Sequence, residues 1–224
     1  MSFIELMDIS KTFYRGKNEI KALNNINLEI SSGDFVSIMG KSGCGKTTLL
    51  NVIAGIEKAD TGRYIYDGTN VGELNQRLIT KFRCNNISLV VQHFALIPNY
   101  TLLENVALPL RYKHVKPAER KEKAKKLIAK LGLQGQEKAY PKELSGGQCQ
   151  RVAIARAIIP ETPVILADEP TGELDSVTGA EIMSILKSIN EQGVTIIIVT
   201  HDNSIKKYCN KNYEMHDGKI LLPK

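Results

Sequence analysis

The sequence GKSGCGKT, from Gly40 to Thr47, matches the phosphate-binding pattern G-x-x-x-x-G-K-[ST] at every fixed position. Glycines let the backbone wrap closely around phosphate groups with its N–H groups pointing inward, and the helix that follows adds the positive end of its dipole. In this pattern Lys46 reaches the β- and γ-phosphates of a nucleotide, and the Thr47 hydroxyl ligates Mg²⁺. The residues predicted to bind the nucleotide here are Gly40, Lys41, Ser42, Gly43, Cys44, Gly45, Lys46, Thr47 and Thr48.

The segments on either side of the loop fit the same prediction. Phe35–Met39 is a short apolar run suited to a buried strand, and Thr48–Ala54 predicts a helix packed on it. The alternative, a glycine-rich turn with an accidental lysine, does not explain this strand–loop–helix order. The dinucleotide-binding pattern G-x-G-x-x-G fails, because Thr48 stands where its third glycine belongs.

Continuous apolar runs further along the chain predict a parallel sheet. Ile87–Val91, Val164–Ala167 and Thr195–Thr200 have the composition of strands that are covered on both faces. Thr178–Gln192 lies between the last two runs as a crossover helix, and this β–α–β order implies parallel strands. We therefore expect an α/β fold with a mainly parallel sheet.

The N-terminal part predicts a separate antiparallel β subdomain. Phe3–Phe13 and Ile20–Ile30 alternate between polar and apolar residues, with a turn at Arg15–Asn18. Gly62–Gly68 predicts a further β segment that ends in an Asp-Gly turn.

The middle of the chain predicts an inserted helical subdomain. Helical patterning extends from Leu102 to Leu133, interrupted by Pro109 and Pro117, and a further helix is expected over Arg151–Ile159. We expect a single domain over residues 1–224, in which residues 1–91 and 160–224 form the core with the antiparallel β subdomain, and residues 92–159 form the helical subdomain.

Composition excludes several classes of protein. The 42% hydrophobic content predicts an ordinary globular core, and no run approaches eighteen consecutive apolar residues, so no membrane-spanning helix is expected. The N-terminal stretch MSFIELMDIS lacks a basic start and contains Glu5 and Asp8, which predicts no signal peptide. The four cysteines lack metal-binding spacing, so free thiols in a reducing cytoplasm are expected.

The net charge of +6 is modest, and much of it lies between Arg111 and Lys130. A solvated helix face is the simplest interpretation. A surface near anionic lipid headgroups is a second one. A nucleic-acid-binding surface is the least favoured interpretation, because no aromatic residues interleave with these charges.

Two acidic residues follow the predicted strand in Val164-Ile-Leu-Ala-Asp-Glu169. Ligands of parallel α/β sheets gather at the carboxyl ends of strands. Asp168 is therefore placed to hold Mg²⁺, and Glu169 to polarise an attacking water. Phosphoryl transfer requires this division, with a metal for charge, a carboxylate for the nucleophile and a lysine on the phosphate oxygens.

Two further polar residues come at the ends of predicted strands. His201 follows Thr195–Thr200 and is placed to contact the γ-phosphate or the attacking water. Gln92 follows Ile87–Val91 and opens the helical segment, where it is placed to contact Mg²⁺ and the water. A histidine or glutamine alone is more often structural; their shared sheet edge favours a catalytic role.

A second anion-binding element is predicted at Leu144–Gln148, which has the sequence LSGGQ. Ser145 and the N–H groups of Gly146 and Gly147 precede a helix, and helix N-termini bind anions. A capping turn is the alternative. Because the chain already contains a complete phosphate loop, we expect Ser145, Gly146, Gly147 and Gln148 to serve another subunit's γ-phosphate in a two-fold dimer.

Across nearly the whole chain, these residues resemble the ATP-binding cassette (ABC) ATPases, which have a P-loop NTPase core. GKSGCGKT corresponds to the Walker A motif, VILADE to the Walker B motif with its catalytic glutamate, and LSGGQ to the signature motif. Gln92 corresponds to the Q-loop, Leu174-Asp175 to the D-loop and His201 to the H-loop.

The resemblance also implies the ligands and the roles of single residues. ATP and Mg²⁺ are the expected ligands, with Thr47, Gln92 and Asp168 on the metal. In this family an N-terminal aromatic residue stacks on adenine, and the matching position is Phe13, with Tyr14 as the fallback. The residues with implied catalytic roles are Lys46, Gln92, Glu169 and His201, and Asp175 joins the nucleotide-binding set.

Finer features resemble the group that powers macrolide and lipoprotein exporters. These are Leu96-Ile-Pro98, Leu103–Pro109 (LENVALP), and the sequences QRVAIARA and LADEPTGELDSVTG. Two residues depart from the group's pattern: Cys149 replaces a glutamine, and Glu173 replaces a small or amide residue. Neither change removes a catalytic group, and Glu173 adds a charge near the expected dimer interface.

The resemblance implies a cytoplasmic subunit, peripheral on the inner face of the cell membrane. It would form a homodimer on ATP binding and drive a separate membrane permease that docks near Gln92–Leu110. A regulatory or mechanical module that gates a membrane sensor or enzyme has the same catalytic apparatus and stays an alternative. ATPases of DNA repair or translation carry coiled coils or two cassettes, which this chain lacks, so no nucleic-acid partner is expected.

Overall fold

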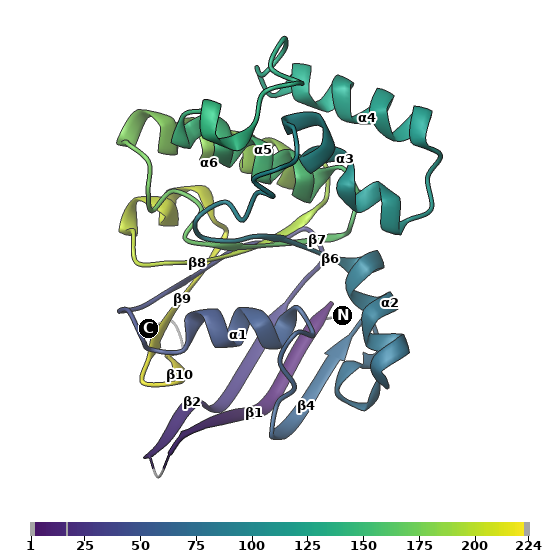
Figure 1. Ribbon diagram of the computed structural model, residues 1–224. Helices are drawn as coiled ribbons and strands as arrows, with labels where there is room; N and C mark the ends of the chain where they lie inside the picture. The colour runs from purple at the N-terminus through teal and green to yellow at the C-terminus, as the bar shows by residue number, and fades with distance from the viewer. Residues whose placement is uncertain (1–2, 17, 222–224) are drawn as a thin grey trace.

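The computed structural model describes residues 3–16 and 18–221, arranged as two sheets with helices between and beside them (Figure 1). One sheet is antiparallel, with the strand order β2-β1-β4-β5. Its strands are β1 (Ile4–Arg15), β2 (Asn18–Ile30), β4 (Thr61–Tyr66) and β5 (Thr69–Asn70). This is the predicted antiparallel subdomain; Lys17, in the predicted turn, lies outside the described residues.

The second sheet has the order β10-β9-β3-β8-β7-β6 and is parallel except for β10. Its strands are β3 (Phe35–Met39), β6 (Ile87–Val90), β7 (Val164–Asp168), β8 (Thr195–Thr200), β9 (Lys211–His216) and β10 (Lys219–Leu221). The mainly parallel α/β fold expected from the sequence is thus confirmed.

Residues 3–16 and 18–221 form six α-helices, of which α1 lies between the two sheets and α4 lies at the outer end of the lobe (Figure 1). They are α1 (Lys46–Ile53), α2 (Gln76–Asn86), α3 (Leu102–Tyr112), α4 (Pro117–Lys130), α5 (Gly146–Ile158) and α6 (Ser176–Asn190). Short 3₁₀ helices occur at Val71–Glu73, Pro141–Glu143 and Asn203–Tyr208. None of the helices in residues 3–16 and 18–221 is long and apolar enough to span a bilayer.

The central strands are covered on both faces, as their continuous apolar sequences predict. In β8, Ile197 and Val199 belong to the hydrophobic cluster that includes α1, whereas Ile196 and Ile198 belong to the cluster that includes α5 and α6. A third cluster joins α3, α4 and α5. The helices of the lobe therefore have a core of their own, separate from the two cores of the sheet.

Several elements differ from the sequence prediction. Helix α2 was not predicted; its sequence is mostly polar, and only Phe82 is buried, in edge-on contacts with Tyr64 and Tyr66. Helix α3 continues past Pro109, because it ends three residues later and loses few backbone hydrogen bonds. Helix α5 begins at Gly146, five residues before the predicted start at Arg151.

Candidate functional site

A cavity of about 570 Å³ opens at the carboxyl ends of β3, β7 and β8. All the residues predicted for catalysis and for metal binding line it, together with half of those predicted to bind the nucleotide. The lining residues are Phe13, Ile20, Lys21, Ala22, Ser42, Gly43, Cys44, Gly45, Lys46, Thr47, Thr48, Gln92, Asp168, Glu169, His201, Asp217 and Gly218.

The phosphate loop is held in shape by its own lysine. Lys46 is buried, and its Nζ donates hydrogen bonds to the carbonyl oxygens of Gly40 at 2.7 Å and Lys41 at 3.1 Å. Gly40 and Lys41, which were predicted to bind the nucleotide, are not among the residues that line the cavity. The ammonium group is thus fixed where anionic phosphate oxygens can replace carbonyl partners.

Gly45 occupies a position that no other residue fits. Its φ of 105° lies in the left-handed region, and an added Cβ would stand 2.2 Å from the carbonyl oxygen of Ala22 on β2. This close approach brings the antiparallel subdomain against the N-terminus of α1. The conformation of the phosphate loop therefore depends on packing between β2 and the N-terminus of α1 as well as on local sequence.

Gly45→Ala should destabilise the fold more than Gly43→Ala. Both positions have positive φ, but nothing lies within 4 Å of a Cβ built on Gly43. Backbone strain therefore lowers the free energy of unfolding of both variants by about 1–3 kcal/mol. The clash with β2 lowers it further in Gly45→Ala alone. Urea unfolding of the nucleotide-free variants measures the difference; equal losses would show that the contact with Ala22 is unimportant.

Asp168 and Thr47 meet at the base of the cavity, where the Thr47 hydroxyl donates to Asp168 Oδ2 at 2.9 Å. Burial raises the pKa of Asp168; the Thr47 hydrogen bond and the charge of Lys46 oppose this rise, and the charge of Glu169 adds to it. Gln92 lines the same cavity. These hydroxyl, carboxylate and amide oxygens are the hard donors that Mg²⁺ prefers, so the residues present fit this ion.

Glu169 is held between the ends of two strands. Its N–H donates to the carbonyl oxygen of Val199 at 2.9 Å, and its φ of 47° turns the chain out of β7. Thr200 Oγ1 donates to Glu169 Oε2 at 2.8 Å, and His201 Nδ1 lies 2.8 Å from Oε1. The carboxylate is thus oriented by β8 while His201 stays largely exposed to the cavity.

The segment after Gln92 connects the cavity to the helical lobe. His93, Phe94 and Ala95 all have positive φ, and Arg156 of α5 donates to the carbonyl oxygens of Phe94 at 2.9 Å and Ala95 at 2.7 Å. His93 Nδ1 also contacts the carboxylate of Glu173. Gln92 is therefore linked to the lobe through three consecutive residues.

The far end of the cavity is partly apolar. Phe13 lines it, whereas Tyr14 is 75% exposed and does not. Two segments of the wall were missed from the sequence: Ile20–Ala22 on β2, and the Asp217-Gly218 turn between β9 and β10. Only the tertiary fold brings them here, since Gly218 N–H donates to Cys44 O at 3.0 Å.

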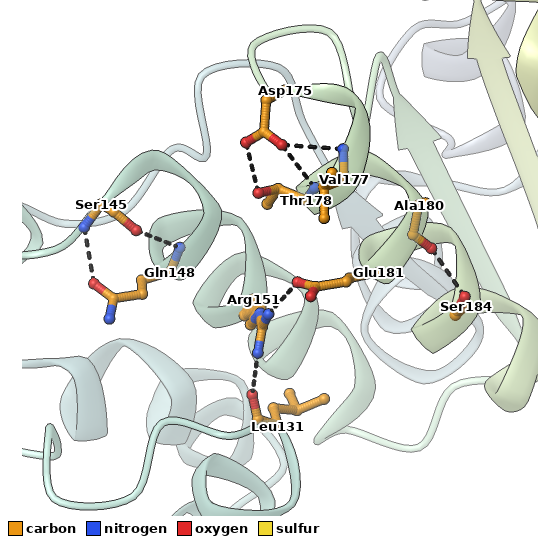
Figure 2. Close-up of polar contacts among 10 residues, drawn as sticks. All are labelled: Leu131, Ser145, Gln148, Arg151, Asp175, Val177, Thr178, Ala180, Glu181 and Ser184. Carbon is orange, nitrogen blue, oxygen red and sulfur yellow. Dashed lines mark hydrogen bonds and ion pairs between the residues drawn. The ribbon is translucent and has the colours of Figure 1, made fainter.

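A second cavity of about 370 Å³ shares no lining residue with the first. It lies at the N-termini of α5 and α6 (Figure 2). Its lining residues are Gly132, Leu133, Ser145, Gly146, Gly147, Gln148, Arg151, Glu173, Leu174, Asp175 and Thr178.

The two helix ends at this second cavity are capped by side chains. Ser145 Oγ accepts from Gln148 N–H at 3.3 Å and Gln148 Oε1 from Ser145 N–H at 2.9 Å, a reciprocal capping box (Figure 2). Asp175 caps α6 by accepting from Val177 and Thr178. The capping box at Ser145 explains why α5 already includes both glycines of the LSGGQ sequence. The helices themselves touch at Gly147, where a Cβ would stand 2.6 Å from Thr178 Cγ2.

Comparison with known families identifies the chain. The model of the family described as "ABC transporter" matches residues 23–172. The chain belongs to the ABC transporter family. This ABC ATPase is 43% identical over 99% of its length to the macrolide export ATP-binding/permease protein MacB of Mannheimia succiniciproducens. It spans only about a third of that protein, because the match covers 34% of it.

Other relatives match this ABC ATPase over nearly their full length. It is 41% identical to the ABC transporter ATP-binding protein YtrE of Bacillus subtilis, with 96% of this chain and 95% of that protein covered. A solved dimeric structure of the ATP-binding cassette MJ0796 from Methanocaldococcus jannaschii, bound to ADP and Pi, superposes with a TM-score of 0.92 at 41% identity, covering 99% of this chain and 97% of that one. The protein is an ABC-type ATPase that binds and hydrolyses ATP.

Proposed function

We propose that this ABC ATPase hydrolyses ATP at two composite sites in a head-to-tail homodimer. The observation that carries this proposal is the separation of the two cavities, which have no lining residue in common. One chain therefore presents Ser145–Gln148 away from its own phosphate loop. A two-fold axis would bring each such surface to the partner's nucleotide, and the solved MJ0796 cassette is dimeric.

The first cavity supports a division of chemical roles. Lys46 binds the β- and γ-phosphates, and Phe13 stacks on the adenine, with Tyr14 as the fallback. Glu169, oriented by Thr200 and His201, accepts hydrogen bonds from the attacking water and polarises it.

The remaining polar residues serve the metal and the partner. Thr47, Asp168 and Gln92 would hold Mg²⁺, which neutralises charge on the phosphate oxygens when bound. Gly40–Thr48 surround the phosphates. Ser145–Gln148 and Asp175 complete the partner's site. We assign residues 92–159 to the moving helical subdomain and residues 1–91 and 160–224 to the core.

The ATPase is proposed to drive an export-type membrane permease from the cytoplasmic face of the cell membrane. Relatives named as exporters join ATP-binding and permease parts in one protein, of which this chain matches one third. These names favour transport over a purely regulatory module. The expected docking region is Gln92–Leu110, and a hollow of about 210 Å³ lies at its end, between β6 and α3.

Tyr112→Asp should break permease docking without changing basal hydrolysis. Tyr112 lines this hollow and is 66% exposed, so a charge there would be buried unpaired under a partner. Co-purification with the permease should fall about tenfold or more, and permease stimulation of the ATPase should disappear.

Ile56→Asp is the matched control, because Ile56 is 50% exposed and does not line the hollow. Unchanged co-purification of the Tyr112 variant would place the docking surface elsewhere. Substrate flux in vesicles containing the complex then tests transport. ATP-dependent gating without flux would favour the regulatory alternative.

A further inference from the structure

The net charge of this ABC ATPase is concentrated in one segment of the helical lobe. Residues Arg111–Lys130 contain nine basic and two acidic residues, a net charge of +7. The other 204 residues contain 21 basic and 22 acidic residues, a net charge of −1. The segment covers the end of α3, the following loop and the outlying helix α4 (Figure 1).

Most cations of this segment have no carboxylate partner. Lys123 pairs with Glu119 at 3.0 Å and Lys126 with Glu122 at 2.7 Å, and these pairs use both acidic residues of the segment. Arg111, Lys116, Arg120 and Lys121 form no ion pair with any residue in 3–16 or 18–221. Their charge is therefore available to an external anion.

Three of these unpaired cations converge on one hollow of about 440 Å³ between α3 and α4. Arg111, Arg120 and Lys121 line it, and Glu104 is its one carboxylate. Glu104 accepts hydrogen bonds from the N–H and hydroxyl of Thr101 at 2.8 Å each, and these bonds lower its pKa. The carboxylate stays negatively charged while it caps α3, so the three cations leave the hollow with a net charge of +2. The apolar lining residues are Leu103, Ala107, Leu108 and Pro117.

The first turn of α4 adds a second attraction for anions. The helix begins at Pro117 after Lys116, and no side chain of the described residues caps its N-terminal N–H groups. An uncapped helix N-terminus carries partial positive charge and unpaired donors. Pro117 lines the hollow, so the first turn of α4, which also carries Glu119, begins at its edge.

We propose that this basic hollow and the first turn of α4 bind anionic phospholipid headgroups at the membrane surface. Basic side chains can place their heads at the headgroups while their stems cover apolar surface. Tyr112 is the one Phe, Trp or Tyr between Arg111 and Lys130, and Tyr100 is the one that lines the hollow, which disfavours a nucleic-acid surface built on base stacking. Lipid contact requires no partner protein, so vesicle binding can be measured on the ATPase alone.

Vesicle co-sedimentation of the full chain tests this proposal. The protein should bind vesicles of phosphatidylcholine containing about one third phosphatidylglycerol, and not pure phosphatidylcholine. The quadruple variant Arg111→Gln, Lys116→Gln, Arg120→Gln, Lys121→Gln should bind about 600-fold more weakly, because each cation near an anionic surface contributes about fivefold. Binding should also weaken steeply between about 0.1 M and 0.5 M salt.

A dispersed quadruple variant controls for total charge. Replacing Lys58, Arg63, Lys81 and Lys207 by Gln removes the same charge from exposed positions elsewhere. It should keep vesicle binding within about threefold of the unchanged protein. Thermal unfolding of both variants checks that each is folded. Equal losses in the two variants, or equal binding to uncharged vesicles, would overturn the proposal, as would tighter binding to a DNA duplex that the clustered variant alone abolishes.

Discussion

Glu169→Gln should reduce the ATP turnover of this ABC ATPase by about 10²–10⁴-fold while leaving ATP binding intact. The amide is the same size and can still accept the hydrogen bond from Thr200, so the cavity keeps its shape. It cannot polarise the attacking water as a carboxylate does. With hydrolysis stopped, the ATP-bound dimer should persist, and size-exclusion chromatography in Mg-ATP should show it.

Glu191→Gln is the control for this variant, because Glu191 is exposed at the end of α6 and touches neither cavity. It should hydrolyse ATP normally and stay monomeric after turnover. If Glu169→Gln remained monomeric at saturating Mg-ATP, the composite-site proposal would fail. If it kept normal turnover, Glu169 would not be the residue that acts on the water.

Ser145→Arg should reduce the rate of ATP hydrolysis by about a hundredfold or more without weakening the chain's own nucleotide binding. The long cationic side chain would fill the second cavity, which encloses about 370 Å³, but cannot reach residues of the first. Fluorescent-nucleotide titration and steady-state ATPase measurement separate the two effects. Ser145→Ala removes the cap of α5, at about 1 kcal/mol, together with the hydroxyl offered to the partner's nucleotide, and serves as the milder variant because it adds no bulk or charge.

Mixing the two inactive variants gives the sharpest result. A heterodimer of Ser145→Arg and Glu169→Gln contains one site with both defects and one site with neither. Random assembly before ATP is added should therefore restore about a quarter of the normal activity, given two-fold symmetry. No recovery on mixing would indicate that Ser145 and Glu169 of the same chain act in one site. Loss of nucleotide binding by Ser145→Arg alone would contradict the separation of the two cavities.

The parts of the fold with strong local patterns were predictable from sequence. The apolar runs of β3, β7 and β8 are buried on both faces, and the loop from Gly40 to Thr47 needs glycine for steric reasons that its spacing reveals. Helix α2 was not predictable, because it buries only Phe82. Strands β9 and β10 were missed as well, since their sequences are mostly polar and partly exposed.

For the candidate site too, local sequence patterns predicted some residues and not others. Asp168 and Glu169 follow a buried strand, so their place at the sheet edge could be inferred. Ala22 and Gly218 could not, because each enters the cavity wall through contacts between distant segments. Sequence spacing predicts which residues carry the chemistry, whereas the shape of the space around them depends on how the two sheets pack.

The three left-handed residues after Gln92 have an energetic consequence. Each costs about 1–2 kcal/mol, so His93, Phe94 and Ala95 together hold about 3–6 kcal/mol of conformational strain. The two charged hydrogen bonds from Arg156 offset this with about 1.5–3 kcal/mol each. Moving α5 away would lose the bonds and release the strain in nearly equal amounts. Strain and hydrogen bonding therefore oppose each other at the joint between core and lobe, so the cost of moving the lobe is smaller than the loss of the two hydrogen bonds alone.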